Sequence, residues 1–95
     1  MRVYLVTYDI TQPKRLRRVH RTLRAWGDAV QYSVFRCDLG EADYIRLKTL
    51  LSDIIHHTLD QVLFIDLGIV GGKREAQIKA LGRPYDVVER SAIVV

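Results

Sequence analysis

The run of residues 2–8 restricts the folds that are open to this chain. It consists mainly of β-branched and aromatic residues, which favour β-strands. Apolar side chains occupy both its odd and its even positions, so a strand here presents apolar groups on both faces. A chain of 95 residues has few elements with which to cover two faces. We therefore expect helices on one face of the sheet and a second copy of the chain on the other, in a homodimer with facing sheets.

Two further segments have the pattern of amphipathic helices. Thr11 and Pro13 are typical of a helix start, with the Thr11 hydroxyl as the expected cap, and Gly27 is typical of a helix end. Between them, apolar residues at spacings of three and four form one stripe: Leu16, Val19, Leu23 and Trp26. A second helix is expected from Gly40 onward, with these residues facing inward: Tyr44, Leu47, Leu50, Leu51, Ile54 and Ile55.

The remaining segments predict strands and one short helix. Residues 29–39 alternate and are rich in strand formers, but the run is long for one strand, so it predicts one bent strand or two short ones. Residues 62–67 predict another strand, residues 74–81 favour a short helix, and residues 87–88 and 92–95 favour short terminal strands. This order predicts one α+β domain: a ferredoxin-like βαββαβ sandwich with an extra C-terminal strand.

Positive charge is concentrated in the first predicted helix. The chain has 15 Lys and Arg residues against 11 Asp and Glu, and six of the 15 lie within residues 10–27, which contain no acid. The six are Lys14, Arg15, Arg17, Arg18, Arg21 and Arg24. A charge run is usually a solvated face, but this helix lacks the acidic i,i+4 partners that stabilise such a face. We therefore interpret it as a surface that binds nucleic-acid phosphates, a role that suits the forked donors of arginine.

Asp9 lies between the first strand and the basic helix. The residues alone leave two interpretations open: a turn or cap residue, since Asp suits both positions, or a ligand of a divalent cation. Mg²⁺ takes one or two carboxylates and keeps several waters. One carboxylate per chain is therefore a poor magnesium site unless a two-fold axis supplies the second.

Other side chains also have both a structural and a functional interpretation. Tyr8 and Phe35 could stack on bases or position a substrate, although packing within strands is the more common role. Cys37 is the only cysteine, which excludes a disulfide framework and fits an inert core thiol. The three histidines lack partners at metal-ligand spacing, so we expect solvated or core roles. No signal peptide is visible and no apolar run approaches the ~20 residues of a membrane helix, so we expect a cytoplasmic protein without membrane contact.

Three features occur in a distinctive order along the chain. They are Tyr8-Asp9-Ile10, the basic helix ending in Trp26-Gly27, and Val30-Gln31-Tyr32-Ser33-Val34-Phe35. In this order and spacing they closely resemble the small CRISPR-associated adaptation proteins of the Cas-two family. The resemblance covers most of residues 2–67. Tyr-Asp-Ile alone is a weak motif, but its combination with Val-Gln-Tyr-Ser-Val-Phe in a chain of this length is specific.

The resemblance implies a ferredoxin-like homodimer with facing sheets. It implies a single domain over residues 1–95, with residues 1–82 as the core and residues 83–95 as a C-terminal strand region that docks on the partner subunit. It also implies that residues 29–39 form a short hairpin-like pair. Finally, it implies that Asp9 faces its symmetry mate, so that the dimer holds one Mg²⁺ between two Asp9 carboxylates.

Two functions follow from the resemblance. In the first, the homodimer is a CRISPR adaptation subunit that bridges two dimers of the Cas-one integrase and binds duplex DNA during spacer acquisition. In the second, it is a Mg²⁺-dependent endonuclease acting on RNA or double-stranded DNA. The candidate catalytic residues are then Asp9, Tyr8, Arg18 and Phe35, with Arg18 neutralising phosphate charge and Phe35 ordering the substrate. Ala29 stands where the family often has a basic residue, which removes one candidate phosphate contact.

A third hypothesis, a generic ferredoxin-like RNA-binding module, comes from a different class of function. The sequence argues against it, because the Gly/aromatic strand pattern of RNP1 is missing.

Overall fold

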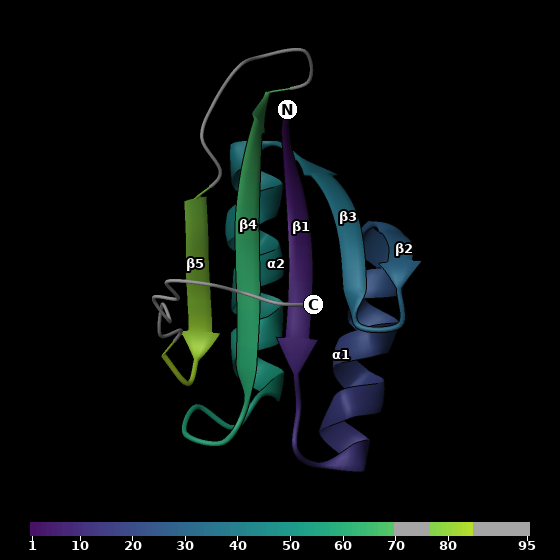
Figure 1. The fold of residues 1–95 in the computed structure, drawn as a ribbon, viewed down its shortest axis with the longest axis vertical. Coiled ribbons are helices and arrows are strands. Elements are labelled where there is room, and N and C mark those ends of the chain that lie inside the picture. Colours follow the sequence, from purple (N-terminus) through teal and green to yellow (C-terminus); the bar gives the residue numbers. More distant parts are fainter. Residues whose placement is uncertain (70–76, 85–95) are drawn as a thin grey trace, which may run out of the picture.

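The described residues fold into a five-stranded antiparallel sheet with two helices (Figure 1). The computed structural model describes residues 1–69 and 77–84. In chain order its elements are β1 (Arg2–Asp9), α1 (Pro13–Trp26), β2 (Asp28–Gln31), β3 (Val34–Leu39), α2 (Glu41–Ile54), β4 (Gln61–Ile69) and β5 (Gln77–Gly82). The strand order is β2-β3-β1-β4-β5, and every neighbouring pair is antiparallel. The predicted ferredoxin-like βαββαβ arrangement is therefore confirmed, and β5 is a further strand that precedes the region, residues 83–95, where the extra C-terminal strand is expected.

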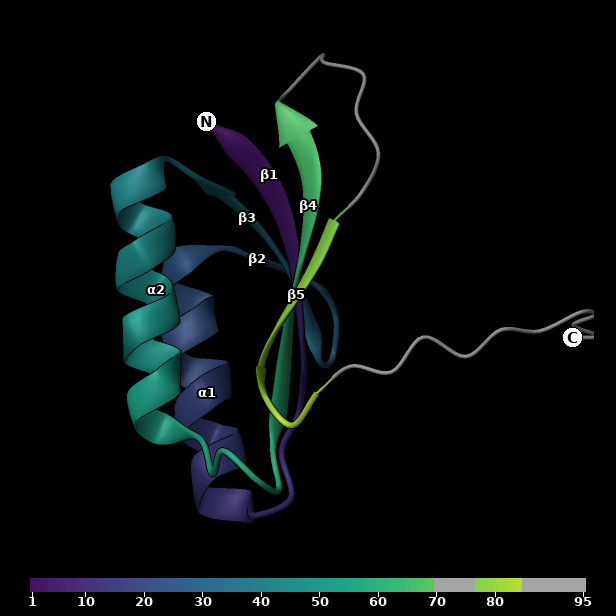
Figure 2. The same ribbon diagram turned by 90° about the vertical axis from the view of Figure 1, so that its left-hand side faces the viewer.

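Both helices pack on one face of the sheet, as the side view in Figure 2 shows. Alternate residues of β1, β3 and β4 point to this face, and the apolar stripes of α1 and α2 meet them. Among the described residues, the fully buried apolar side chains are Val6, Val19, Leu23, Phe35, Cys37, Leu47, Leu51 and Val62, with Phe64 almost fully buried. Leu16 and Trp26, at the ends of the α1 stripe, are partly buried against this core. The predicted stripe is thus confirmed.

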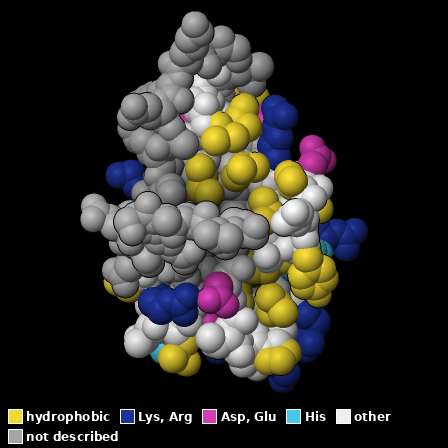
Figure 3. Space-filling model, viewed as in Figure 1, with side chains coloured by type: hydrophobic (Ala, Val, Ile, Leu, Met, Phe, Trp, Pro, Cys, Tyr) yellow, Lys and Arg dark blue, Asp and Glu magenta, His cyan; other side chains and the backbone are white. Residues whose placement is uncertain are grey.

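The other face of the sheet is apolar and is covered by neither described helix (Figure 2). In β1 and β4 the partners Leu5 and Ile65 lie opposite each other, as do Thr7 and Leu63, and all four are half-buried. Hydrophobic side chains gather along the middle of this face in Figure 3. A sheet face of this composition is suited to packing against another surface.

Three local predictions need correction. Residues 77–82 form the strand β5 and not part of a helix, because they complete the hydrogen bonds along the edge of β4 and tertiary pairing overrides local helix propensity. Leu50 does not face inward but is 41% exposed. The helix α1 is capped by Gln12, whose side chain accepts a bond from the Arg15 backbone N–H at 2.8 Å, and not by Thr11.

Two other predictions concern the strands. Residues 29–39 lie in two short strands, β2 and β3, as the hairpin interpretation requires. The terminal strands expected at residues 87–88 and 92–95 lie outside the described residues, as does the part of the predicted short helix before residue 77.

Candidate nucleic-acid interface

Asp9 ends β1, opposite Gln61 of β4, and its side chain is 67% exposed. Its carboxylate accepts a hydrogen bond from the guanidinium of Arg83 at 2.9 Å. Arg83 also donates to the backbone oxygen of Leu59 at 3.1 Å, which holds the guanidinium at this end of the sheet. An exposed ion pair contributes about 1 kcal/mol or less. Arg83 is therefore a weak competitor that a cation or another ligand of Asp9 can displace.

The described residues of one chain do not form a metal cluster. Within residues 1–69 and 77–84, no group of three or more His, Cys, Asp or Glu side chains converges. Asp9 alone supplies one carboxylate, and Mg²⁺ can accept one or two carboxylates with waters. The chemistry of Asp9 thus fits a shared magnesium site only if a second copy brings another carboxylate, and the metal role stays a prediction.

Arg15 differs from the other cations of α1 because an acid already holds it, and its expected contact with phosphate stays a prediction. Its Nε donates to Asp60 at 2.7 Å, and the Asp60 side chain is fully buried. The same carboxylate accepts bonds from the Thr11 backbone N–H and hydroxyl, both at 3.0 Å, and from the His56 backbone N–H at 2.8 Å. Asp60 thereby joins the start of α1 to the loop before β4.

The pKa of Asp60 reflects this environment. Burial alone raises the pKa of a carboxyl group. Here the hydrogen bonds from Arg15, from the backbone N–H groups of Thr11 and His56 and from the Thr11 hydroxyl outweigh burial, so the pKa lies well below its usual range. Asp60 is therefore a charged structural residue that the sequence analysis did not single out.

The other five cations of α1 form an exposed basic face. They are Lys14, Arg17, Arg18, Arg21 and Arg24. None of the five forms an ion pair with an acid among the described residues. Charges of one sign on one helix repel each other, whereas a polyanion would remove that repulsion. This face is the strongest candidate for contact with nucleic-acid phosphates.

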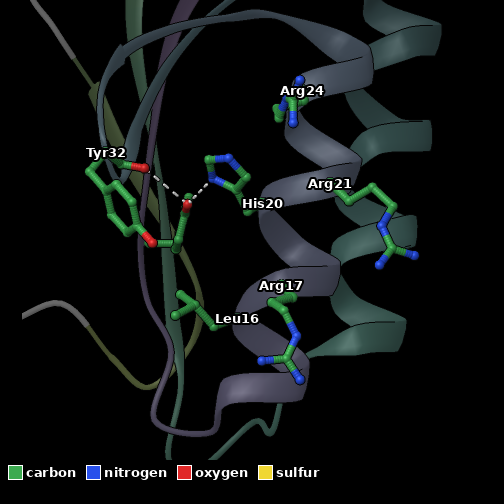
Figure 4. A pocket seen from close by; sticks show the side chains of 7 residues that line it. Leu16, Arg17, His20, Arg21, Arg24 and Tyr32 are labelled. Atoms are coloured by element: carbon green, nitrogen blue, oxygen red, sulfur yellow. Dashed lines mark hydrogen bonds between the residues drawn. The ribbon is translucent and has the colours of Figure 1, made fainter.

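A hollow of about 200 Å³ lies between α1 and the turn that joins β2 to β3. Figure 4 shows His20 projecting from α1 toward Tyr32 of that turn. The rings of His20 and Tyr32 stack with centroids 5.9 Å apart. The Tyr8 hydroxyl donates to the Tyr32 backbone oxygen at 3.1 Å and bonds His20 Nδ1 at 2.7 Å. Burial, and then the charge of a nearby Tyr32 phenolate, raises the pKa of Tyr8.

The predicted catalytic residues do not all lie together. Tyr8 reaches the hollow with its hydroxyl, but its ring is buried and stacks on Phe35. Phe35 is fully buried and packs in the core, so it presents no surface to a substrate in the single chain. Its expected role in ordering a substrate stays a prediction. Arg18 lies on the side of α1 that faces α2, where it lines another hollow with Leu50 and Asp53.

His20, expected in a solvated or core role, and Tyr32, expected only as part of the Val30–Phe35 motif, both line this hollow. A signal was present, because Arg17, His20, Arg21 and Arg24 follow at spacings of three, one and three and so occupy one stripe of a helix. The proximity of Tyr32 had no such signal, since it depends on how the hairpin folds over α1.

Cys37 is a buried thiol, as predicted. Burial, followed by the nearby charges of Asp38 and Asp28, raises its pKa to about 11. Because the thiolate is the reactive form, this cysteine is a poor nucleophile in the folded protein. Neither described helix has the length and apolar character needed to cross a bilayer.

The fold and the basic helix define a small ferredoxin-like α+β protein whose candidate site is a cationic helix beside a strand-end carboxylate. The family described as CRISPR associated protein Cas2, the Cas-two family above, matches residues 1–70. The chain therefore belongs to the CRISPR-associated Cas2 family.

Individual relatives agree with this assignment. The chain is 36% identical to "CRISPR-associated endoribonuclease Cas2 1" of Rhodospirillum rubrum over 97% of this chain and 89% of the relative. It is 32% identical to "CRISPR-associated endoribonuclease Cas2" of Geobacter sulfurreducens over 98% and 97% of the two chains. A crystal structure of Streptococcus pyogenes Cas2 at pH 6.5 superposes with a TM-score of 0.61 at 36% identity, covering 65% of this chain and 81% of that one.

A fourth comparison supports the fold alone. The crystal structure of a hypothetical protein, TT1823 from Thermus thermophilus, superposes with a TM-score of 0.57 at 22% identity, covering 96% of this chain and 92% of that one.

Proposed function

We propose that this protein is a CRISPR adaptation subunit that binds duplex DNA through α1 and, as a homodimer, bridges integrase dimers during spacer acquisition. The observation that carries the proposal is the set of five exposed cations on α1, none of which is paired with an acid among the described residues. An exposed arginine that contacts a phosphate releases counterions from DNA and contributes to binding regardless of sequence.

A charge-reversal experiment tests the DNA-binding surface. The variant Arg17→Glu/Arg18→Glu/Arg21→Glu should lose duplex binding while remaining folded, because the buried stripe of α1 is unchanged. The control Arg36→Glu/Arg46→Glu/Lys79→Glu makes the same change in net charge at exposed positions on β3, α2 and β5. Equal losses in the two variants would show that net charge, and not α1, governs binding.

The salt dependence measures single contacts. If Arg18 contacts one phosphate, Arg18→Ala should flatten the slope of log K against log salt by ~0.9 on two unrelated duplexes alike. An unchanged slope for Arg18→Ala and for the triple reversal would place the duplex on another surface.

The names of the relatives favour a second role, a nuclease. We propose that Asp9 from each of two copies holds one Mg²⁺, with Arg18 neutralising phosphate charge and the Tyr8 hydroxyl near the substrate. When bound, the metal would polarise the phosphodiester and lower the pKa of a water. Within the chain, Arg83 donates to the Asp9 carboxylate at 2.9 Å and would give up this bond to a cation bound by Asp9.

Asp9→Ala separates the two roles. It should abolish Mg²⁺-stimulated cleavage of RNA and of duplex DNA while leaving duplex binding unchanged, whereas the exposed-acid control Asp53→Ala should leave both unchanged. Cleavage that is equal in Asp9→Ala and wild type would show that the activity does not come from this carboxylate.

A further inference from the structure

The hollow between α1 and the β2–β3 turn has two kinds of wall. Its lining residues are aromatic or apolar on one side and cationic on the other: Tyr8, Leu16, His20 and Tyr32, and Arg17, Arg21 and Arg24. No acid is among these lining residues. A site that combines an aromatic surface with arginines suits a ligand that has both a flat ring and a negative charge.

The aromatic wall is already held in position. Tyr32 is 80% exposed, but its backbone oxygen accepts a hydrogen bond from the Tyr8 hydroxyl at 3.1 Å. Tyr8 lies in the central strand, so this bond ties the turn to the rigid part of the fold. The inner surface of the ring faces His20. A planar group that stacks here meets a turn that is ordered in advance, which lowers the entropy cost of binding.

The hydrogen bonds of the Tyr8 hydroxyl determine which ring nitrogen of His20 can accept a hydrogen bond from a ligand. The Tyr32 carbonyl can only accept, and the Tyr8 hydroxyl has one proton to donate. When both bonds form, His20 must donate from Nδ1 to the Tyr8 oxygen. The Nε2 atom of a neutral His20 is then an acceptor for a donor on the ligand.

The cationic wall runs along the helix. Arg17 and Arg24 are seven residues apart, which corresponds to about 10 Å along α1. Figure 4 shows their side chains at opposite ends of the hollow, with His20 between them. Arg21 lies at the border with the second hollow, beside α2. A phosphate beside this wall can accept forked hydrogen bonds from one guanidinium.

We propose that this hollow binds a single nucleotide, with its base against Tyr32 and His20 and its phosphate on Arg17 or Arg24. The volume of about 200 Å³ is below the 300–1,000 Å³ of pockets for drug-sized ligands, so it suits one base and its phosphate. A base paired within a duplex cannot stack on Tyr32. The ligand is therefore either a free nucleotide or an unpaired nucleotide at the end of a DNA strand. Binding of the strand end rests on the DNA-binding function proposed above, whereas binding of a free nucleotide does not.

Titration with adenosine 5′-monophosphate, adenosine and inorganic phosphate tests the site on the full chain. The nucleotide should bind more tightly than either fragment and shift the NMR signals of His20 and Tyr32. Tyr32→Ala should weaken nucleotide binding about tenfold, because the loss of one base–aromatic stack lowers the affinity by about that factor. Tyr32→Phe keeps the ring and should retain the wild-type affinity. Both changes keep the backbone oxygen that Tyr8 bonds, and circular dichroism checks the fold.

Two exposed arginines, one on each helix, provide a matched comparison. Arg17→Ala should weaken binding of the nucleotide but not of adenosine, whereas Arg46→Ala on α2 should leave nucleotide binding unchanged, because Arg46 does not line this hollow. Equal affinity for nucleotide and phosphate, or an unchanged affinity in Tyr32→Ala, would overturn the proposal and leave only an anion-binding surface.

Binding of a blunt duplex and of a duplex with a single unpaired 3′ adenosine distinguishes a free nucleotide from a strand end as the ligand. A strand end is the ligand if the overhang duplex binds more tightly than the blunt one and if Tyr32→Ala abolishes that gain in affinity. Nucleotide binding without any such gain would identify the free nucleotide. If the protein binds no nucleotide and gains no affinity from the overhang, the proposal is overturned. The affinity for the blunt duplex tests separately whether α1 binds duplex DNA.

Discussion

Asp9 and Asp60 lie at the same end of the sheet but in opposite environments. Asp9 is 67% exposed and has one guanidinium partner, whereas Asp60 is fully buried and accepts bonds from three residues. A buried carboxylate is tolerated only when such bonds replace its water. Asp9 is therefore available for ligands, whereas Asp60 is committed to the fold.

Asp60→Asn tests this commitment. At pH 7 the free energy of unfolding should fall by on the order of 3 kcal/mol, because Arg15 loses its buried ionic partner. The folded-state pKa of Asp60 is lowered, so its contribution is present above the unfolded value of about 3.9 and is lost as the pH falls below that. The stabilities of variant and wild type should therefore begin to approach each other below about pH 4 and become equal only as the pH falls through the lowered folded-state pKa.

The control for this prediction is Asp53→Asn. Asp53 is an exposed acid of α2, and its replacement should change the free energy of unfolding by no more than about 0.5 kcal/mol. If Asp60→Asn were equally mild at pH 7, the bonds around Asp60 would make no net contribution to stability.

Single residues were the hardest to predict from sequence. The family motifs pointed to Asp9, but no spacing rule pointed to Asp60, which lies 45 residues from Arg15. Arg15 was accordingly grouped with the other cations of its helix. Phe35 was correctly weighed as a packing residue, because strand alternation places it on the same face as Cys37. Partners that are distant in sequence become visible only once the chain is folded.

At the scale of the element, α1 serves three surfaces at once. Val19 and Leu23 enter the core, Arg15 holds Asp60, and the remaining cations face outward. The end of this helix is set by Gly27, which passes close to β3. A methyl group there would overlap the Arg36 backbone oxygen and lie 2.5 Å from the Cys37 sulfur.

Gly27→Ala should therefore destabilise the protein by about 1–3 kcal/mol, the usual cost of overpacking. The matched change Gly40→Ala meets no atom within 4 Å at the start of α2 and should alter the free energy of unfolding by only a few tenths of a kcal/mol. Urea denaturation of the two variants measures the difference. Similar stabilities would mean that β3 moves aside without cost.

Elements with strong local patterns were predicted correctly, and β5 was not. The two helices have apolar stripes that can be read directly, and residues 62–67 lie within β4 as expected. Residues 77–82 have a composition that suits a helix as well as a strand. The exposed edge of β4 decides between them, because it needs partners for its backbone groups.

At the scale of the whole molecule, the uncovered sheet face raises the question of assembly. Val3, Leu5, Val34, Leu63 and Ile65 are half-buried in the single chain. Figure 2 shows both described helices on one face of the sheet, which leaves the other face without a helix. A domain of this size gains stability by burying such a face. The predicted facing-sheet homodimer remains the arrangement that we propose.

Leu5→Asp should weaken the homodimer at least tenfold, because it places an unpaired charge between two sheets. Light scattering should give twice 11.0 kDa for wild type at micromolar concentration and about 11.0 kDa for the variant. Val30→Asp, at an exposed position on β2, is the control and should leave the mass unchanged. A folded wild-type monomer would contradict the homodimer.

The central place of β1 in the sheet affects how the chain folds as it leaves the ribosome. One edge of β1 finds its partner when β3 is complete at Leu39, but the other waits for β4, which ends thirty residues later at Ile69. At synthesis rates of 5–20 residues per second, this interval lasts about 1.5–6 s. During that time the nascent chain exposes an apolar strand with an unpaired edge, which can pair with a neighbouring nascent chain. Slow translation between these two points would therefore favour aggregation over the native sheet.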